Sequence, residues 1–211
     1  MPRTLLQRYY PQLTDAQLDR LEQLGPLYRT WNERINVISR KDIDQLYERH
    51  ILHGLALLPH LRLIAGARVL DLGTGGGIPG LPLAIAYPQA HFTLIDARRK
   101  KIEVVQAIAD AIGLDNVTAR HVRAEEVKER YDFVVSRAVA KLDKLYPWAK
   151  ALLALQQRHA QPNGLYTWKG GDVQSEIKAL GKRQYTEVLP IRDILTDLDY
   201  YDEKYLVYVQ G

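Results

Sequence analysis

Cysteine is absent from this chain of 211 residues, and no run of apolar residues is long enough to span a membrane. Without cysteine there are no disulfides, no thiolate metal ligands and no cysteine nucleophile. A membrane-spanning helix needs about 20 consecutive apolar residues, and the N-terminal stretch MPRTLLQRYY contains no apolar signal core. We therefore expect a cytoplasmic protein with no membrane contact.

A strong charge of either sign is also missing. The 29 basic and 25 acidic residues give a formal net charge of +4, which permits an anionic partner without requiring one. No group of His, Asp and Glu has the spacing of a metal site, so we expect no metal. A hydrophobic fraction of 46% is ordinary for a globular protein with a real core.

The first 60 residues predict a small helical cap. A capping-box spacing between Thr14 and Gln17 opens the first helix, which Gly25 is suited to end. Apolar residues at helical spacing continue beyond it. The two further helices are expected over 26–35 and 41–59.

From residue 61 to 211 short β-rich runs alternate with helical stretches. This alternation predicts a mostly parallel sheet with helices on both faces. We expect helices over 98–112 and 146–159, and an antiparallel hairpin from the last two β-rich runs. The expected strands are 68–72, 91–96, 117–122, 131–137, 165–169, 184–190 and 204–209.

The stretch VLDLGTGGGIPG, residues 69–80, lies between the first of these strands and the next helix. Ligands of such sheets bind at the carboxyl ends of the strands, where glycines such as Gly73 and Gly75 let the backbone approach them closely. The P-loop pattern does not match, but a GxGxxG dinucleotide pattern does. Asp71 before a GxGxG also suits S-adenosylmethionine (SAM), since an acid can hold its cationic end directly or through water.

Two later acidic positions support a nucleotide ligand. Asp96 ends the second strand, about 20 residues past the loop, where a carboxylate accepts both ribose hydroxyls. Arg98 or Arg99 could instead meet a 2′-phosphate, which keeps an NADP oxidoreductase as a distant alternative. At the end of the third strand, Glu125 or the Ala124 carbonyl could accept from an adenine amino group. An acidic helix start exposed to water explains the same residues equally well.

The fourth strand should end over a transferred methyl group, at the sequence SRAV. The Asn/Asp-Pro-Pro-aromatic motif typical of exocyclic-amine methylation is missing there, and RNA carbon-5 methylation needs a cysteine. What remains is a target that needs no activation; guanine N7 is such an atom, because it has a lone pair, carries no proton and needs only orientation. Arg137 could hold O6, a phosphate or the cofactor carboxylate, or else be a surface arginine.

Several segments between Trp31 and Gly171 resemble the RsmG (GidB) family. They are WNERINVIS, RHILHGLAL, VLDLGTGGGIPGLPLAI, LIDARRKK, RAEE, VVSRAVA and YTWKG. The resemblance implies a class I SAM-dependent methyltransferase (Rossmann-like) fold, with a seven-stranded sheet and an N-terminal helical cap. It also implies methylation of guanine N7 in 16S ribosomal RNA of the small ribosomal subunit, in the bacterial cytoplasm.

The same resemblance assigns individual positions. It places Arg123 and Arg137 as active-site arginines. It also puts polar positions near the RNA entrance, although His50 could equally be a core residue and Lys169 an exposed strand end. The family usually has Asp-Ser where this chain has His53 and Gly54. The implied cofactor residues are Gly73, Ile78, Ala124, Glu125 and Arg137, and the implied RNA-binding residues are Asn36, His50 and Lys169.

Two other functions stay open at this point. Because a fold does not fix a substrate, a small-molecule methyltransferase would share these features. A non-catalytic module that binds SAM or RNA would bind the cofactor without transferring its methyl group.

Overall fold

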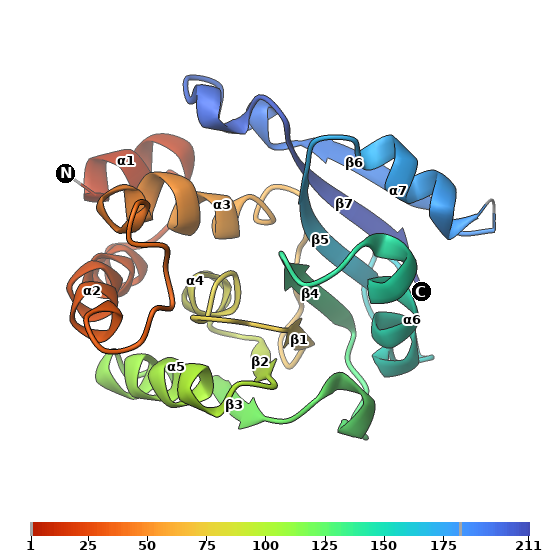
Figure 1. Ribbon diagram of the computed structural model, residues 1–211, viewed down its shortest axis with the longest axis horizontal. Coiled ribbons are helices and arrows are strands. Elements are labelled where there is room, and N and C mark those ends of the chain that lie inside the picture. The colour runs from red at the N-terminus through yellow and green to blue at the C-terminus, as the bar shows by residue number, and fades with distance from the viewer. Residues whose placement is uncertain (1, 182) are drawn as a thin grey trace.

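The computed structural model describes residues 2–181 and 183–211 and contains one seven-stranded sheet in the order β3-β2-β1-β4-β5-β7-β6 (Figure 1). Strands β3, β2, β1, β4 and β5 are parallel, and β7 runs antiparallel to both β5 and β6. The predicted seven-stranded, mostly parallel sheet and its terminal antiparallel pair are confirmed. The strands are β1 (Arg68–Leu72), β2 (His91–Asp96), β3 (Val117–His121), β4 (Phe133–Arg137), β5 (Gly164–Gly170), β6 (Thr186–Pro190) and β7 (Lys204–Gln210).

The order of the strands reverses between β1 and β4. The chain runs outward from β1 to β3 and then returns to place β4 on the other side of β1. Loops that leave the carboxyl ends of these two strands therefore diverge, which opens a crevice where ligands of such sheets bind.

Helices cover both faces of the sheet, as expected (Figure 1). One face packs against α4 (Gly80–Ala86), α5 (Arg99–Ala111) and the N-terminal helices. The other face packs against α6 (Leu142–Leu152) and α7 (Val173–Leu180). Side chains alternate between the two cores along each strand, as Val69 and Leu70 do on β1.

The N-terminal segment contains α1 (Pro2–Tyr9), α2 (Asp15–Asn32), the short turns η1 (Ile43–Gln45) and η2 (Tyr47–Ile51), and α3 (Leu52–Leu55). The capping box at Thr14 is confirmed. The single regular helix expected over 41–59 is wrong, because this stretch is divided into 3-10, π and α turns. Its apolar residues join the core that α4 and the sheet share, and the division into units 1–60 and 61–211 stays a prediction.

The predicted helix end at Gly25 is also wrong, since α2 continues through Gly25 and Pro26. Proline has no N–H, so the Glu22 carbonyl one turn earlier loses its helical partner. The Tyr47 hydroxyl replaces that partner by donating to the Glu22 carbonyl at 2.6 Å, and it accepts from the Gly25 N–H at 3.0 Å. A tertiary contact therefore repairs the helix where local sequence favours a break.

Helix α6 begins four residues earlier and ends seven residues earlier than the predicted range 146–159. At its start, the Leu142 N–H donates to the Glu176 carboxylate of α7 at 2.9 Å. At its end, Leu153 is extended and pairs with Tyr131. Among the described residues, no helix is long and apolar enough to cross a membrane.

Candidate active site

The glycine loop follows β1 and has a backbone that favours glycine. Gly73, Gly75 and Gly77 have φ of 71°, 61° and 95°, a region that other residues rarely adopt. A Cβ atom on Gly73 would also lie only 2.4 Å from the Cγ2 atom of Val139. Residue 73 is therefore restricted to glycine both by its own conformation and by the neighbouring loop.

Asp71 supports this loop from behind. The side chain is fully buried, and its Oδ2 atom accepts from the Thr74 hydroxyl at 2.7 Å and the Gly80 N–H at 2.9 Å. Burial raises the pKa of Asp71 to about 7, although the Thr74 and Gly80 hydrogen bonds oppose the shift. Asp71 does not line the cavity that lies on the other side of this loop and is described next. Any effect of Asp71 on the cofactor would therefore be indirect, through the loop that it supports.

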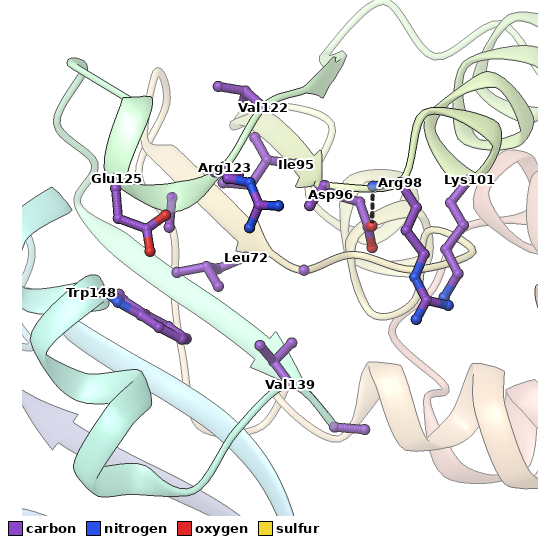
Figure 2. A pocket seen from close by; sticks show the side chains of 14 residues that line it. Leu72, Ile95, Asp96, Arg98, Lys101, Val122, Arg123, Glu125, Val139 and Trp148 are labelled. Atoms are coloured by element: carbon purple, nitrogen blue, oxygen red, sulfur yellow. Dashed lines mark hydrogen bonds between the residues drawn. The ribbon is translucent and has the colours of Figure 1, made fainter.

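A cavity of about 330 Å³ opens at the carboxyl ends of β1 and β2 (Figure 2). We call it the cofactor cavity. It contains the predicted positions Gly73, Asp96, Arg123, Ala124 and Glu125. Its lining residues are Leu72, Gly73, Ile95, Asp96, Ala97, Arg98, Lys101, Val122, Arg123, Ala124, Glu125, Ala138, Val139 and Trp148.

Asp96 is fixed at the end of β2 by two backbone donors. Its Oδ2 atom accepts from the Gly75 N–H at 3.0 Å. Its Oδ1 atom accepts from the Arg98 N–H at 2.8 Å, the hydrogen bond drawn in Figure 2. Each carboxylate oxygen has a second lone pair, and the side chain is only half-buried. Such an oriented carboxylate fits the two hydroxyls of a ribose, and the surrounding apolar side chains fit an adenine.

Part of this cavity comes from residues that the sequence patterns do not predict. Trp148 of α6 lies across the cavity from Arg98 and Lys101, and Val139 closes its lower side (Figure 2). The predicted helix began only at Tyr146, so nothing placed Trp148 near the glycine loop. Trp148 lies six residues past the observed start of α6, and no local signal in the sequence distinguishes it.

A second cavity, of about 290 Å³, lies beside the first and brings three predicted residues together. We call it the acceptor cavity. Ala138 lines both cavities and has a left-handed backbone with φ of 57°. The lining residues of the acceptor cavity are His50, His53, Arg137, Ala138, Trp168, Lys169, Gly170, Tyr200 and Lys204.

The charged groups of the acceptor cavity differ in their partners. The Arg137 guanidinium lies 3.2 Å from Nδ1 of His50. Burial and the neighbouring Arg137 together lower the pKa of His50 to about 4, although Asp42 opposes the shift, so His50 is neutral and accepts this hydrogen bond. Lys169 pairs with Glu176 at 2.8 Å and donates to the Ala140 carbonyl. Arg137 has no carboxylate within 4 Å among the described residues.

The remaining predicted residues lie outside both cavities. The Gly75 N–H binds Asp96, and Ile78 is buried beside Gly54. Asn36 is exposed on the segment after α2. These positions contribute to the loop and the surface, and their predicted roles in binding stay predictions.

The strand order, the glycine loop after β1 and the carboxylate ending β2 define a class I SAM-dependent methyltransferase. Solved structures agree on the fold. A SAM-dependent methyltransferase from Aquifex aeolicus matches with a TM-score of 0.55 and 16% identity, over 82% of this chain and 98% of that chain. A chain from a structure of a fibrillarin/Nop5p complex matches with a TM-score of 0.58 and 14% identity, over 77% of this chain and 81% of that chain.

The family can be stated more closely. Residues 17–189 match the GidB family, described as rRNA small subunit methyltransferase G, and the chain belongs to it. Ribosomal RNA small subunit methyltransferase G of Porphyromonas gingivalis is 49% identical, over 88% of this chain and 84% of that protein. The Parabacteroides distasonis protein of the same name is 47% identical, over 98% and 88%. The cofactor of this family is SAM, which the cofactor cavity fits.

Proposed function

We propose that this protein methylates N7 of a guanine in 16S ribosomal RNA of the small ribosomal subunit, in the cytoplasm. One observation carries the proposal beyond family membership: a cofactor cavity and an acceptor cavity meet at Ala138. A group transfer between two bound molecules requires two adjoining sites, and this arrangement supplies them.

In the cofactor cavity, Asp96 would accept from the ribose hydroxyls. Ala124 and Glu125 would meet the adenine edge, and Trp148 would cover its face. SAM, when bound, supplies an electrophilic methyl group carried on a sulfonium. The residues of the chain then need to orient this cofactor and exclude water.

In the acceptor cavity, guanine N7 needs no base because it carries no proton. This agrees with the lining, which includes no carboxylate in the part of the chain that the structure describes. Arg137 would donate to O6, because a donor on N7 itself would occupy the reacting lone pair. The neutral ring of His50 accepts from Arg137 and so holds it in place.

Recognition of RNA would use shape and phosphates. Exposed or partly exposed cations lie at the rim of the cofactor cavity, at Arg98, Lys101 and Arg123. Asn36 would contribute farther out, on the exposed segment after α2. These groups would position a substrate loop without reading its bases.

Transfer of labelled methyl from SAM tests the proposal. Small ribosomal subunits from cells that lack the corresponding methyltransferase are the substrate, and chain cleavage specific to 7-methylguanine locates the product. One labelled site in 16S RNA is the expected result. Label in low-mass acceptors alone would favour a small-molecule methyltransferase, and SAM binding without any transfer would favour a non-catalytic module.

A further inference from the structure

His53 is a buried imidazole whose polar atoms have no partner. It is 6% exposed, and neither ring nitrogen makes a hydrogen bond of standard geometry, although the Arg49 carbonyl lies close enough to the ring to oppose the lowering of its pKa. A buried polar group without a partner destabilises a fold, so such groups in native proteins commonly serve a function. Since His53 lines the acceptor cavity, a ligand there can supply the missing partner.

The position of the ring is well defined. The Trp168 indole N–H donates to the His53 carbonyl at 2.5 Å, which ties this part of the N-terminal segment to β5. The edge of the Tyr201 ring packs against the imidazole, with 5.5 Å between ring centroids. His53 is therefore held in place beside the cavity that it lines before any ligand arrives.

The other polar side chains of this cavity are mostly donors. Arg137, Lys169 and Lys204 carry N–H groups and no acceptor. The Nδ1 acceptor of His50 is already occupied by Arg137, which leaves its unpartnered Nε2 as an N–H donor. Tyr200 is half-buried and its hydroxyl is not among the buried unpartnered atoms. His53 is thus the buried acceptor that the lining still offers.

Its protonation state suits this role. Burial first, and then Arg137, His50 and Lys204, lower the pKa of His53 well below its usual value, while the Arg49 carbonyl opposes the shift. A neutral imidazole has one N–H and one lone pair. Guanine presents the complementary set, an O6 acceptor next to the N1–H and amino donors, whereas adenine carries an amino donor where guanine has O6.

We propose that His53 is a specificity-determining residue that accepts a hydrogen bond from the N1–H or amino group of the acceptor guanine while Arg137 donates to O6. This inference rests on the proposed function. It assigns the choice of guanine over other purines to a residue pair from two distant segments, since His53 follows η2 and Arg137 ends β4.

Three variants and two substrates test the proposal. His53→Leu removes the acceptor, His53→Gln keeps one, and His60→Leu removes a partly buried imidazole with an unpartnered nitrogen that lies outside both cavities. One substrate is the small subunit reconstituted with normal 16S RNA. The other carries purine riboside at the target position, which keeps N7 and lacks O6, the N1–H and the amino group.

On the guanine substrate we expect His53→Leu to lower kcat/KM about 10- to 100-fold, while His53→Gln recovers most of the loss and His60→Leu matches the wild type. On purine riboside His53→Leu and the wild type should be equal, because the donor is gone. SAM affinity should not change, and the melting temperature should stay equal or rise since an unpartnered group is removed.

Equal activity of wild type and His53→Leu on guanine would overturn the proposal. So would a loss of the same size on purine riboside, which would reveal a structural role. A wild-type protein that binds SAM but methylates neither substrate would overturn the proposed function itself, and the role of His53 with it.

Discussion

The cofactor cavity and the acceptor cavity lie side by side but are assembled differently. The first is built mostly from loops that directly follow β1, β2, β3 and β4, and its polar atoms include two carboxylates, three cationic side chains and backbone groups. The second combines His50 and His53 of the N-terminal segment with residues of β4, β5 and the η5–β7 region. The cofactor cavity thus follows from the sheet itself. The acceptor cavity depends in addition on segments that pack beside the sheet.

The largest expected effect tests which cavity Arg137 serves. Arg137→Ala should lower kcat/KM for methyl transfer about 100- to 1000-fold, because a preorganised donor at the reacting base is lost. The affinity for SAM, measured by calorimetry, should change less than 10-fold, because the lost donor contacts the acceptor base and not the cofactor. The control Arg192→Ala removes an exposed arginine that pairs with Asp202 and should have no effect. An equal loss of SAM affinity would assign Arg137 to the cofactor instead.

Asp71→Asn tests whether the buried acid supports the loop or binds the cofactor. The folded-state pKa of about 7 exceeds the usual 3.8, so the folded state binds the proton more tightly. The contribution of Asp71 to stability is therefore present below pH 4 and lost as pH rises through 7, by up to about 4 kcal/mol.

Thermal unfolding of Asp71→Asn between pH 4 and pH 8 should lack this decline. Its SAM affinity should remain within about threefold of the wild type. A large loss of SAM affinity with unchanged pH dependence would instead support direct or water-mediated contact between Asp71 and the cofactor.

Gly73→Ala should damage the cofactor cavity through the backbone. The left-handed φ and the 2.4 Å approach to Val139 both oppose a side chain, and together they should weaken SAM binding about 100-fold. Gly66→Ala is the matched control, since Gly66 has the same φ of 71° with nothing within 4 Å of an added Cβ. If both variants bind SAM equally well, the contact between residue 73 and Val139 does not determine SAM binding.

Asp96→Ala should have the smallest effect of the four. Losing the ribose acceptor should weaken SAM binding by roughly 1–3 kcal/mol. Calorimetry measures this directly, with the exposed Asp115→Ala as the control. Unchanged affinity would show that Asp96 serves only to bind the Gly75 and Arg98 N–H groups.

Much of the fold could be predicted because its signals are local. Each predicted strand matches an observed one, and the glycine loop lies where the pattern placed it. The errors came from distant partners. Tyr47 carries α2 through Pro26, and Glu176 caps an earlier start of α6. Neither partner is near in sequence to the helix it changes.

The candidate site divides in the same way. Gly73 and Asp96 were found because a motif and a spacing identify them. Trp148 and Tyr200 were missed, since nothing within their own segments distinguishes them from ordinary core aromatics.

By itself the sequence determined the order of strands and helices, the loop after β1 and the family. Periodicity and glycine conformation act over a few residues, so they can be read without the fold. Only the tertiary structure decided that His50, His53, Arg137 and Lys169 line one cavity. It did so because the N-terminal segment packs on the sheet through a shared apolar core. Burial then left the ring nitrogens of His53, one of the lining residues, without partners.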